Sequence, residues 1–422
     1  MNKSIKFETA LSRAVLPVAT LICLAGAIFF AKWYFANSIS LQAPSKDVAE
    51  FSADLAPNDP QTHYALAVLN EKTFLPEDLS KSLAEFEQAT ALAPHDFRLW
   101  LALGKARERS GNAAGAEAAL RKALALAPNY AAAQWTLGNV LLRRGKTAEA
   151  FNEIRRSAAN DVAYRNQTIT TAWQIFDGDL AAVRQHIGDA PNLNSALAVF
   201  LAKSKRFDEA FDIWSGLPSE EKKTTLKSDG ENLFGAMLAE KKYRDALRVQ
   251  QSISDQPNAE RFAPGKIFNG GFETEVMREK AGIFDWQIAD GAQPQIGFDD
   301  AQRHDGNRSL VIIYNSATGR EFRLISQTAV VEAGKTYAFE LFYKSDLKTA
   351  ATFRWEIVDA SDGKVLAATG TIAASADWTN LKAEFTTSNN TQAVTVRLAR
   401  EACKSIVCPI SGKVWFDDFA IN

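Results

Sequence analysis

The sequence predicts a multidomain protein with three parts: an N-terminal transmembrane helix, an all-α solenoid and an all-β antiparallel sandwich. Three observations support this: an uncharged apolar run near the N-terminus, a 34-residue period in the middle of the chain, and period-two alternation of apolar and polar residues near the C-terminus. The length of 422 residues agrees with two or three modules of roughly 150 residues each.

Composition excludes several classes of protein. Hydrophobic residues make up 46% of the chain and charged residues 23%, which suits packed cores and argues against a disordered chain or a polytopic membrane protein. The net charge is only -2, without the positive excess of nucleic-acid-binding proteins, so we expect no nucleic-acid partner. The 4 histidines lie far apart in the sequence and do not indicate a metal site built from histidine.

Residues 1–36 are predicted to be a cytoplasmic tail followed by a membrane anchor. Three basic residues among the first 13 precede an apolar run over 14–31, and the aromatic residues 33–35 follow it. A helix of this length nearly crosses a hydrocarbon core of roughly 30 Å. The basic flank places the N-terminus in the cytoplasm, so we expect a single-pass protein of the inner membrane, bound to the bilayer through 14–35, with the bulk of the chain in the periplasm.

Two other interpretations of this segment remain. A cleaved signal peptide has the same basic and apolar regions, but large residues, Phe29 and Tyr34, stand two positions before Ala31 and Ala36, where a cleavage site needs small ones. A buried core helix in a cytosolic adaptor agrees less well with the basic flank and the aromatic residues. We favour a retained anchor, followed by a linker over 37–59.

Residues 60–254 repeat themselves. A shift of 34 residues superposes Leu103 on Leu137 and Gly104 on Gly138, and the same shift backwards places Leu69 under Leu103. Small residues such as Gly104 allow two antiparallel helices to approach closely, and a proline such as Pro128 ends the second helix of a pair. This spacing and residue code resemble the tetratricopeptide repeat (TPR). The resemblance covers 61 to about 158 and, with weaker copies beyond, implies about six helical hairpins.

Tetratricopeptide-type solenoids generally bind a protein partner on the concave surface that the first helix of each pair lines. Carried over to this chain, the resemblance implies that six residues face this groove: Arg98, Leu101, Lys105, Ala132, Trp135 and Asn139. Trp135 has a second interpretation, as a core residue displaced by a local rotation of its helix.

After a Pro- and Gly-containing linker over 255–265, the pattern changes to strands. Segments such as 336–344 and 393–399 alternate with period two, and turn clusters separate them, so we expect about eight short strands in an antiparallel sandwich over 266–422.

Several landmarks make this module more specific. The segments NGGFE (269–273), GNRSL (306–310), DWTNLKAEF (377–385) and VWFDDFAI (414–421) occur in an order that resembles carbohydrate-binding modules of families 4/9 and 22, which have a galactose-binding-like jelly roll. The resemblance implies a polysaccharide ligand held on exposed aromatic rings, for which the candidates are Tyr314, Phe322, Phe342 and Trp415. The alternative is a structural or protein-contacting sandwich.

Related modules often hold a structural Ca²⁺ between the first and last strands. The resemblance implies carboxylate ligands from Glu273 and Asp418 and carbonyl ligands near Gly271 and Asn307, in keeping with the preference of Ca²⁺ for hard oxygen ligands. The alternative is that the acidic residues at 417–418 only solvate an edge strand. We expect no other cofactor.

Cys403 and Cys408 lie close together in CKSIVC, between two predicted strands. In an exported domain such a pair favours a disulfide bond, whereas in a cytosolic protein it would stay reduced. Cys23 falls in the apolar run.

Catalytic motifs are missing from the sequence, which has no glycine-rich phosphate loop, nucleophile elbow, HExxH or cysteine-rich metal pattern. We therefore expect no enzyme. The order of the parts favours a membrane-anchored scaffold of the bacterial cell envelope, which binds a protein through its repeats and glycan through its sandwich, in polysaccharide synthesis or export. The alternative is a carbohydrate-active enzyme or its accessory subunit, with the sandwich as a targeting module.

Overall fold

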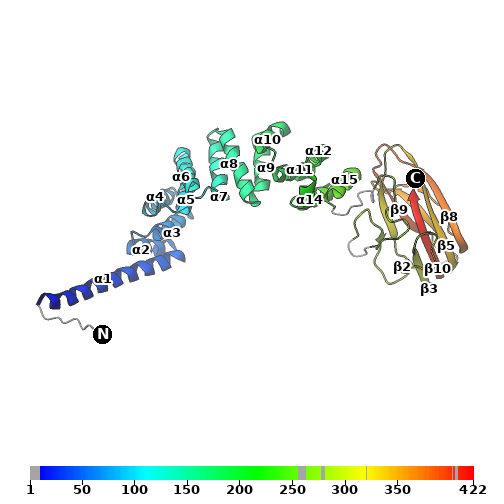
Figure 1. The fold of residues 1–422 in the computed structure, drawn as a ribbon, viewed down its shortest axis with the longest axis horizontal. Coiled ribbons are helices and arrows are strands. Elements are labelled where there is room, and N and C mark those ends of the chain that lie inside the picture. The colour runs from blue at the N-terminus through cyan, green and yellow to red at the C-terminus, as the bar shows by residue number, and fades with distance from the viewer. Residues whose placement is uncertain (1–9, 255–262, 277–280, 320, 402, 404–406) are drawn as a thin grey trace, which may run out of the picture. The chain divides into compact units, whose positions relative to one another are not determined.

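The computed structural model describes residues 10–254, 263–276, 281–319, 321–401, 403 and 407–422 (Figure 1). Most of the predicted cytoplasmic tail and of the linker over 255–265 lies outside these residues. The chain divides into two compact units, one ending at Leu193 and one spanning Asn194–Asn422.

The first unit begins with a long helix, α1 (Ala10–Leu41). Its stretch Pro17–Leu41 is long and apolar enough to cross a membrane. The region predicted as a linker, 37–59, instead contains the end of α1 and a complete helix, α2 (Lys46–Leu55), because Ala49 and Ala53 pack against Leu66 of the next helix. The small size of these apolar residues explains why the sequence did not reveal α2.

Antiparallel helix pairs follow. In the first unit they are α3 (Pro60–Glu71), α4 (Pro76–Leu92), α5 (Phe97–Arg109), α6 (Ala113–Leu126), α7 (Ala131–Arg143), α8 (Thr147–Asn160), α9 (Ala163–Ile175) and α10 (Leu180–Ile187). The helices that belong mainly to the second unit are α11 (Pro191–Lys203), α12 (Phe207–Ser215), the short α13 (Ser219–Lys223), α14 (Lys227–Ala239) and α15 (Tyr243–Ile253). The six predicted hairpins are thus present.

Glycine permits the close packing within these pairs. A Cβ atom on Gly138 of α7 would lie 2.5 Å from Cγ1 of Ile154 and 3.2 Å from the carbonyl oxygen of Ala150, both on α8. Gly104 of α5 faces Leu120 of α6 in the same way, with 2.6 Å to Cγ. A side chain at either position would force the two helices apart.

A repeated hydrogen bond fixes the start of three successive first helices. The side chains of His63, Trp100 and Gln134 each contact the carbonyl oxygen of a proline six residues earlier, at 2.8, 2.9 and 2.8 Å. Those prolines, at 57, 94 and 128, are separated by thirty-seven and then thirty-four residues. The first hairpin therefore has three extra residues, which lie in the turn after α3 and in the first turn of α4, and Leu66 rather than Leu69 corresponds to Leu103. The predicted alignment was wrong there.

His63 makes a second contact, from Nδ1 to Oε2 of Glu85 on α4, at 2.5 Å. Both partners of the ring are acceptors, and a neutral imidazole has only one N–H to donate, so this geometry is that of an imidazolium. The hydrogen bond to Glu85 raises the pKa of His63 above its usual value, more than burial lowers it.

The sandwich consists of two five-stranded antiparallel sheets, ordered β1-β4-β9-β6-β7 and β2-β3-β10-β5-β8. The strands are β1 (Gln287–Ile288), β2 (Gln295–Asp299), β3 (Ser309–Ser316), β4 (Ile325–Val330), β5 (Thr336–Thr349), β6 (Thr352–Asp359), β7 (Val365–Ala368), β8 (Ser375–Thr386), β9 (Ala393–Glu401) and β10 (Ile410–Ile421). The described residues thus hold ten strands where about eight were expected. Alternate residues of both sheets, among them Trp355 and Phe416, fill one core between the sheets together with Trp286, which directly precedes β1.

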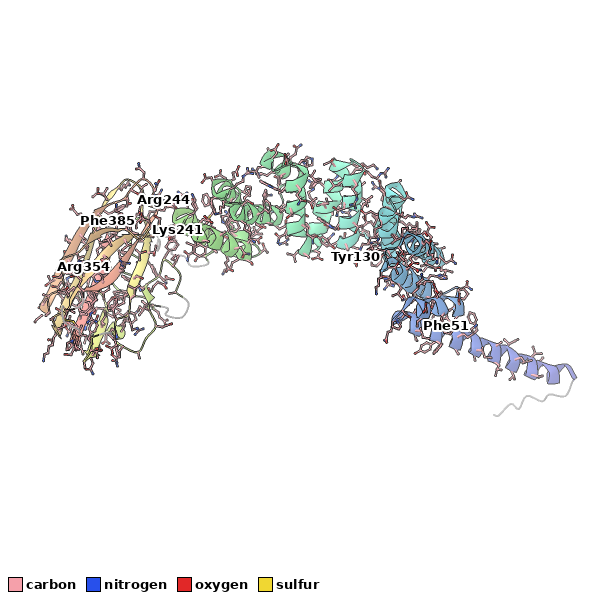
Figure 2. The ribbon with its side chains drawn as sticks, turned by 180° about the vertical axis from the view of Figure 1, so that it is seen from behind. Phe51, Tyr130, Lys241, Arg244, Arg354 and Phe385 are labelled. Carbon is pink, nitrogen blue, oxygen red and sulfur yellow. A yellow bond between two sulfur atoms is a disulfide. The ribbon has the colours of Figure 1, made fainter. Side chains whose placement is uncertain are left out.

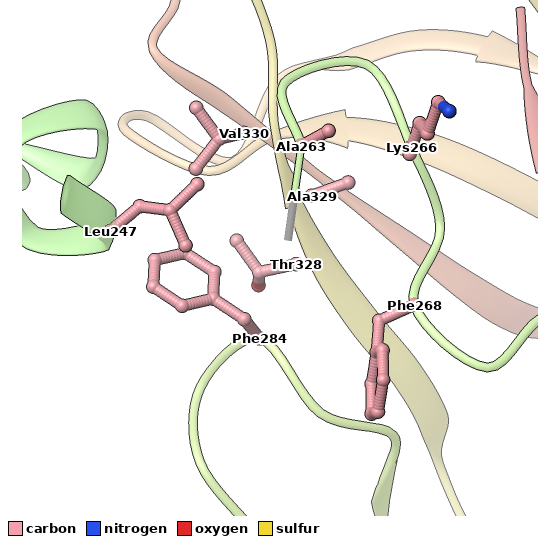
Figure 3. Close-up of a pocket in the computed structure, with 8 residues that line it drawn as sticks. All are labelled: Leu247, Ala263, Lys266, Phe268, Phe284, Thr328, Ala329 and Val330. Carbon is pink, nitrogen blue, oxygen red and sulfur yellow. The ribbon is translucent and has the colours of Figure 1, made fainter. Parts of the chain in front are cut away.

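Helix α15 packs against the sandwich within the second unit. The guanidinium of Arg244, labelled in Figure 2, donates to the carbonyl oxygens of Val331 and Thr391 at 3.0 and 2.9 Å. The hydroxyl of Tyr243 donates to the carbonyl oxygen of Ala360 at 3.1 Å. Leu247 lies against Phe284 and Val330 (Figure 3). The cavity beside them measures about 10 Å³, which is room for about one water molecule, so it is not a ligand site.

The His63–Glu85 pair predicts a pH dependence of the first hairpin. A raised histidine pKa contributes stability that is fully present below the unfolded value of 6.5 and is lost as the pH rises through the folded pKa. Amide hydrogen exchange of α3 and α4, corrected for the intrinsic rate, should therefore report lower protection at pH 8.5 than at pH 6.

The variant His63→Gln is the matched control. Gln134 shows that glutamine can make the same bond to a proline carbonyl, so this variant should fold and its protection should not change over this pH range. An equal pH dependence in wild type and variant would contradict the ion-pair interpretation.

Candidate binding surfaces

The predicted groove residues lie on α5 and α7. The side chain of Arg98 is 74% exposed and makes two hydrogen bonds to Asp96, which caps the start of its helix. Lys105 and Ala132 are half-buried. Asn139, also half-buried, donates from Nδ2 to the carbonyl oxygen of Trp135 at 3.0 Å. These residues leave a mixed polar and apolar surface that a peptide can contact.

Leu101 is not part of this surface. It is buried in a cluster with Leu137 and Ala133 of α7, so it joins two successive repeats, and its prediction as a groove residue was wrong. Trp135 occupies the corresponding position one repeat later and packs on Tyr164 of α9, with 5.3 Å between ring centroids. Trp135 remains half-buried, so it both joins two repeats and contributes an exposed edge.

Ion pairs connect the ends of successive first helices. Glu71 of α3 pairs with Arg109 of α5, and Glu108 of α5 pairs with Arg143 of α7. The first ion pair could not be predicted from the repeat period, because the first hairpin has three extra residues. The second ion pair follows the repeat period and could have been predicted from the sequence. Along the same helices, the ring of Phe97 lies 4.8 Å from that of Tyr130, which is 41% exposed.

Buried charge also joins the second helix α6 to the turn between α7 and α8. The carboxylate of Glu117 on α6 accepts hydrogen bonds from Arg121, Arg144 and Lys146. Burial alone would raise the pKa of Glu117, but the hydrogen bonds from Lys146 and Arg121 outweigh it and hold this pKa below its usual range. The repeats are therefore tied together by charge on both helices of a pair.

Two of the four predicted glycan-contacting aromatics are buried. Tyr314 is 3% exposed and packs on Phe353, because it alternates with Leu310 and Ile312 on the inward face of β3. Burial raises the pKa of its hydroxyl. Trp415 is 8% exposed, and its Nε1 donates to Oδ2 of Asp299 at 2.8 Å. The prediction of exposed rings at these two positions was wrong.

The other two predicted aromatics are half-buried. Phe322 packs against the sandwich core. The ring of Phe342 is stacked on His304, with 3.7 Å between centroids and 12° between planes, and Trp378 contacts the same histidine edge-on. One face of Phe342 is thus already covered by a protein side chain and offers no open platform for a sugar ring.

The outer face of the sheet β1-β4-β9-β6-β7 carries a polar array that we name the polar face. Core residues such as Val396 and Trp355 alternate with its members, which point the other way. Strand pairing places Ser326 opposite Arg397, and Arg397 opposite Glu356. The polar face consists of Ser326 and Thr328 on β4, Thr395 and Arg397 on β9, and Arg354 and Glu356 on β6.

Two guanidinium groups hold the central carboxylate of the polar face. Arg354 donates to Oε1 of Glu356 at 3.0 Å, and Arg397 donates to Oε2 at 2.8 Å. Burial alone would raise the pKa of Glu356, but the hydrogen bonds from Arg397 and Arg354 outweigh it and keep this pKa below its usual range. The two arginines are about one-third exposed, and Nη1 of Arg354 also pairs with Glu401 at 2.6 Å, so both guanidinium groups are held in fixed positions.

The predicted calcium ligands lie together near the start of the sandwich. Glu273 accepts hydrogen bonds from the backbone and the side chain of Asn307, at 2.7 and 2.8 Å. A Cβ atom on Gly271 would lie 3.5 Å from Oδ1 of Asp418 and 3.7 Å from Oδ1 of Asp417.

Asp417 is fully buried next to these groups, and burial raises its pKa to about 6. The donors that it receives among the described residues are backbone N–H groups, including that of His304 at 2.9 Å. The donor chemistry therefore suits a hard cation. As arranged, however, no group of three or more Asp, Glu, His or Cys side chains in the described part of the chain is close enough to hold a metal ion.

Cys403 and Cys408 form a disulfide bond, as predicted. Residues 404–406 of the loop that it closes lie outside the described residues. Cys23, on α1, is exposed and is the free cysteine of the described chain.

Comparison with known proteins identifies both domains. A family model described as a carbohydrate binding domain matches residues 265–402, and a tetratricopeptide repeat model matches residues 77–131 and 101–162. No curated protein sequence matches this chain.

Solved structures with similar folds include the two kinds of domain. A crystal structure of MamA is 18% identical, with a TM-score of 0.31, over 40% of this chain and 86% of that one. A structure titled "CBM4 structure and function" is 19% identical, with a TM-score of 0.28, over 37% of this chain and 98% of that one. A Clostridium thermocellum xylanase 10B with a CBM22-1 module is 15% identical, with a TM-score of 0.25, over 38% of this chain and 29% of that one.

The matched residues lie within the helical hairpins and within the sandwich of the structure. The chain thus contains segments that match tetratricopeptide repeats, followed by a segment that matches a carbohydrate binding domain.

Proposed function

We propose that this protein is a non-enzymatic, membrane-anchored scaffold of the bacterial cell envelope that binds a protein through its repeats and a glycan through its sandwich. The observation that carries the proposal is the order of the parts: an apolar, exposed helix, an array of tetratricopeptide repeats and a carbohydrate-binding domain. Such a chain brings a glycan and a protein together at the inner membrane, which suits polysaccharide synthesis or export.

The protein partner is proposed to bind along α5 and α7. Lys105 and the exposed edge of Trp135 lie on these helices, and ion pairs such as Glu108–Arg143 hold the helices in register. A preorganised surface loses little conformational entropy when it binds an extended peptide.

The glycan is proposed to bind on the polar face rather than on the predicted aromatic residues. Tyr314 and Trp415 are buried, whereas the outward N–H groups of Arg354 and Arg397 and the hydroxyl groups of the neighbouring threonines are fixed across adjacent strands. Sugar hydroxyl groups need donors and acceptors in such fixed positions.

A structural Ca²⁺ is proposed at the cluster of Gly271, Glu273, Asn307 and Asp418. The buried carboxylate of Asp417 supports it, because a bound cation would compensate a charge that burial disfavours. When bound, the ion would join the first and last segments of the sandwich.

The topology is tested by fusing a reporter enzyme after Asn422. A reporter that folds only in the cytoplasm should be inactive, because the uncharged run 14–31 and its basic flank place the C-terminus across the membrane. The same reporter fused to a chain that lacks residues 1–36 should be active. Activity in both fusions would contradict the anchor.

The two binding surfaces are tested with a pair of variants of the full chain in detergent. On an array of bacterial and plant polysaccharides, Arg397→Ala should weaken binding roughly tenfold or more, because it removes charged hydrogen-bond donors. In affinity capture from membranes, the same variant should retain the protein partner.

Lys105→Glu should show the reverse, losing the protein and keeping the glycan. Lys382→Ala, which removes an exposed charge from the other sheet, is the control for both measurements. Binding of a polysaccharide that Arg397→Ala leaves unchanged would contradict the polar face as the site, and no binding to any polysaccharide would contradict the glycan function.

Calcium binding is tested by thermal unfolding of the sandwich, followed by tryptophan fluorescence. Millimolar Ca²⁺ should raise the unfolding temperature by roughly 5 °C or more, and Mg²⁺ should not replace it, because Mg²⁺ demands a more rigid octahedral site. Asp418→Asn should abolish the increase, and Asp300→Asn, which changes an exposed carboxylate nearby in the sequence, should retain it. An unfolding temperature that Ca²⁺ does not change would contradict the site.

A further inference from the structure

The backbone at the end of α2 matches the ends of two second helices of the repeats. Ala56, Ala93 and Ala127 follow α2, α4 and α6, with φ/ψ values of -136/75, -132/72 and -136/78°. A proline follows each of these alanines, and its carbonyl oxygen accepts the repeated hydrogen bond described above. By this measure α2 is the second helix of a hairpin.

Burial along α2 agrees with this assignment. The residues three positions before the helix ends, Ser52, Ala89 and Ala123, are all 0% exposed. Three positions earlier, Ala49 of α2 corresponds to Phe86 of α4 and Leu120 of α6. Phe86 and Leu120 fill the space between paired helices in the next two repeats, and all three residues are buried.

The first helix of this hairpin is the end of α1. Ala36 and Ser40, one turn apart, are buried there, whereas the described side chains before Ala36 are predominantly exposed. Nδ2 of Asn37 donates to Oδ2 of Asp59 at 2.7 Å, and Asp59 in turn caps the start of α3. The last turns of α1 thus join both α2 and α3, as the first helix of a repeat does.

We infer that the repeat array begins inside the membrane helix, and that its first hairpin, α1–α2, rests on the bilayer surface with Phe51 in the lipid headgroup layer. This inference depends on the proposed membrane anchor. It assigns to α2 a partner, a zwitterionic lipid surface, in addition to the protein and glycan partners.

The depth of Phe51 follows from the geometry of the hairpin. Burial in α1 begins at Ala36, directly after the exposed aromatic residues 33–35, which mark the level of the membrane interface. A short turn joins α1 to α2, and α2 packs back along α1. Phe51 is five residues from the start of α2, and Ala36 is five residues from the end of α1. Five residues span about 7.5 Å along each helix, so Phe51 and Ala36 lie at the same depth relative to the membrane.

The side chains around Phe51 fit a headgroup position. Phe51 is 53% exposed, and aromatic rings are enriched at membrane interfaces (Figure 2). The acidic residues Asp47, Glu50 and Asp54 are exposed on the same helix and keep α2 out of the hydrocarbon. They also favour zwitterionic over anionic lipid.

Spin labels on the full chain in phosphatidylcholine vesicles test this inference. Single cysteines are placed by Ile28→Cys, Phe51→Cys and Tyr130→Cys in a Cys23→Ser background, with the disulfide left intact. The rates at which each spin label collides with dioxygen, which concentrates in lipid, and with a water-soluble nickel chelate report the depth of the label in the bilayer. We expect hydrocarbon depth at 28, full aqueous exposure at 130, and a value between them at 51. An aqueous value at 51 with hydrocarbon depth at 28 would overturn the inference and leave the anchor intact, whereas an aqueous value at 28 would overturn the anchor itself.

A second pair of variants tests whether α1 belongs to the hairpin. Ala36→Trp cannot fit a fully buried site, so it should separate α1 from α2 and shift the label at 51 towards the aqueous value. Ser38→Trp, on the exposed side of the same turn, is the matched control and should leave the label unchanged. The label at 130 reports whether the later repeats remain folded. A label at 51 that Ala36→Trp leaves unmoved would overturn the inference.

Discussion

The helical half of this protein depends on how closely two helices of a pair can approach. At Gly104 and Gly138 there is no room for a Cβ atom, because Leu120 and Ile154 of the facing helices occupy that space. This contact sets the spacing within a pair, and the hydrogen bonds to the carbonyl groups of Pro57, Pro94 and Pro128 then set where the next pair begins. Ion pairs between Glu71 and Arg109 and between Glu108 and Arg143 then connect successive first helices.

Much of this half could be predicted from the sequence, because its code is local. Glycine, alanine and proline recur at a fixed spacing, and each acts within its own pair of helices. What could not be predicted depends on contacts outside the repeat. The extra residues in the turn after α3 and at the start of α4 shift the register of α3. The buried residues of α2 are small, and only the end of α1 and the start of α3 reveal their burial.

The sandwich shows the same division between local and long-range information. Alternation in β3 already places Tyr314 on the same side as Ile312, so its burial was predictable from the sequence. The bond from Trp415 to Asp299 and the stacking of His304 on Phe342 join segments more than thirty residues apart, and no local pattern shows them. The polar face carries no aromatic residue of the kind typical of sugar platforms, because its members are arginine, glutamate and hydroxyl residues on three strands, so no sequence motif marks it.

The bonds from Arg244 to Val331 and Thr391 affect where this chain can be divided. Both acceptors are backbone carbonyl groups of the sandwich, and Leu247 covers Phe284 and Val330 beside them. A fragment that begins at 266 would lack the donors to these two carbonyl groups. It would also expose the apolar patch of Phe284 and Val330 to water, which favours aggregation. A cut in the turn between α10 and α11, at 188–190, keeps α15 with the sandwich, and a module exchanged with another protein would have to carry these last helices with it.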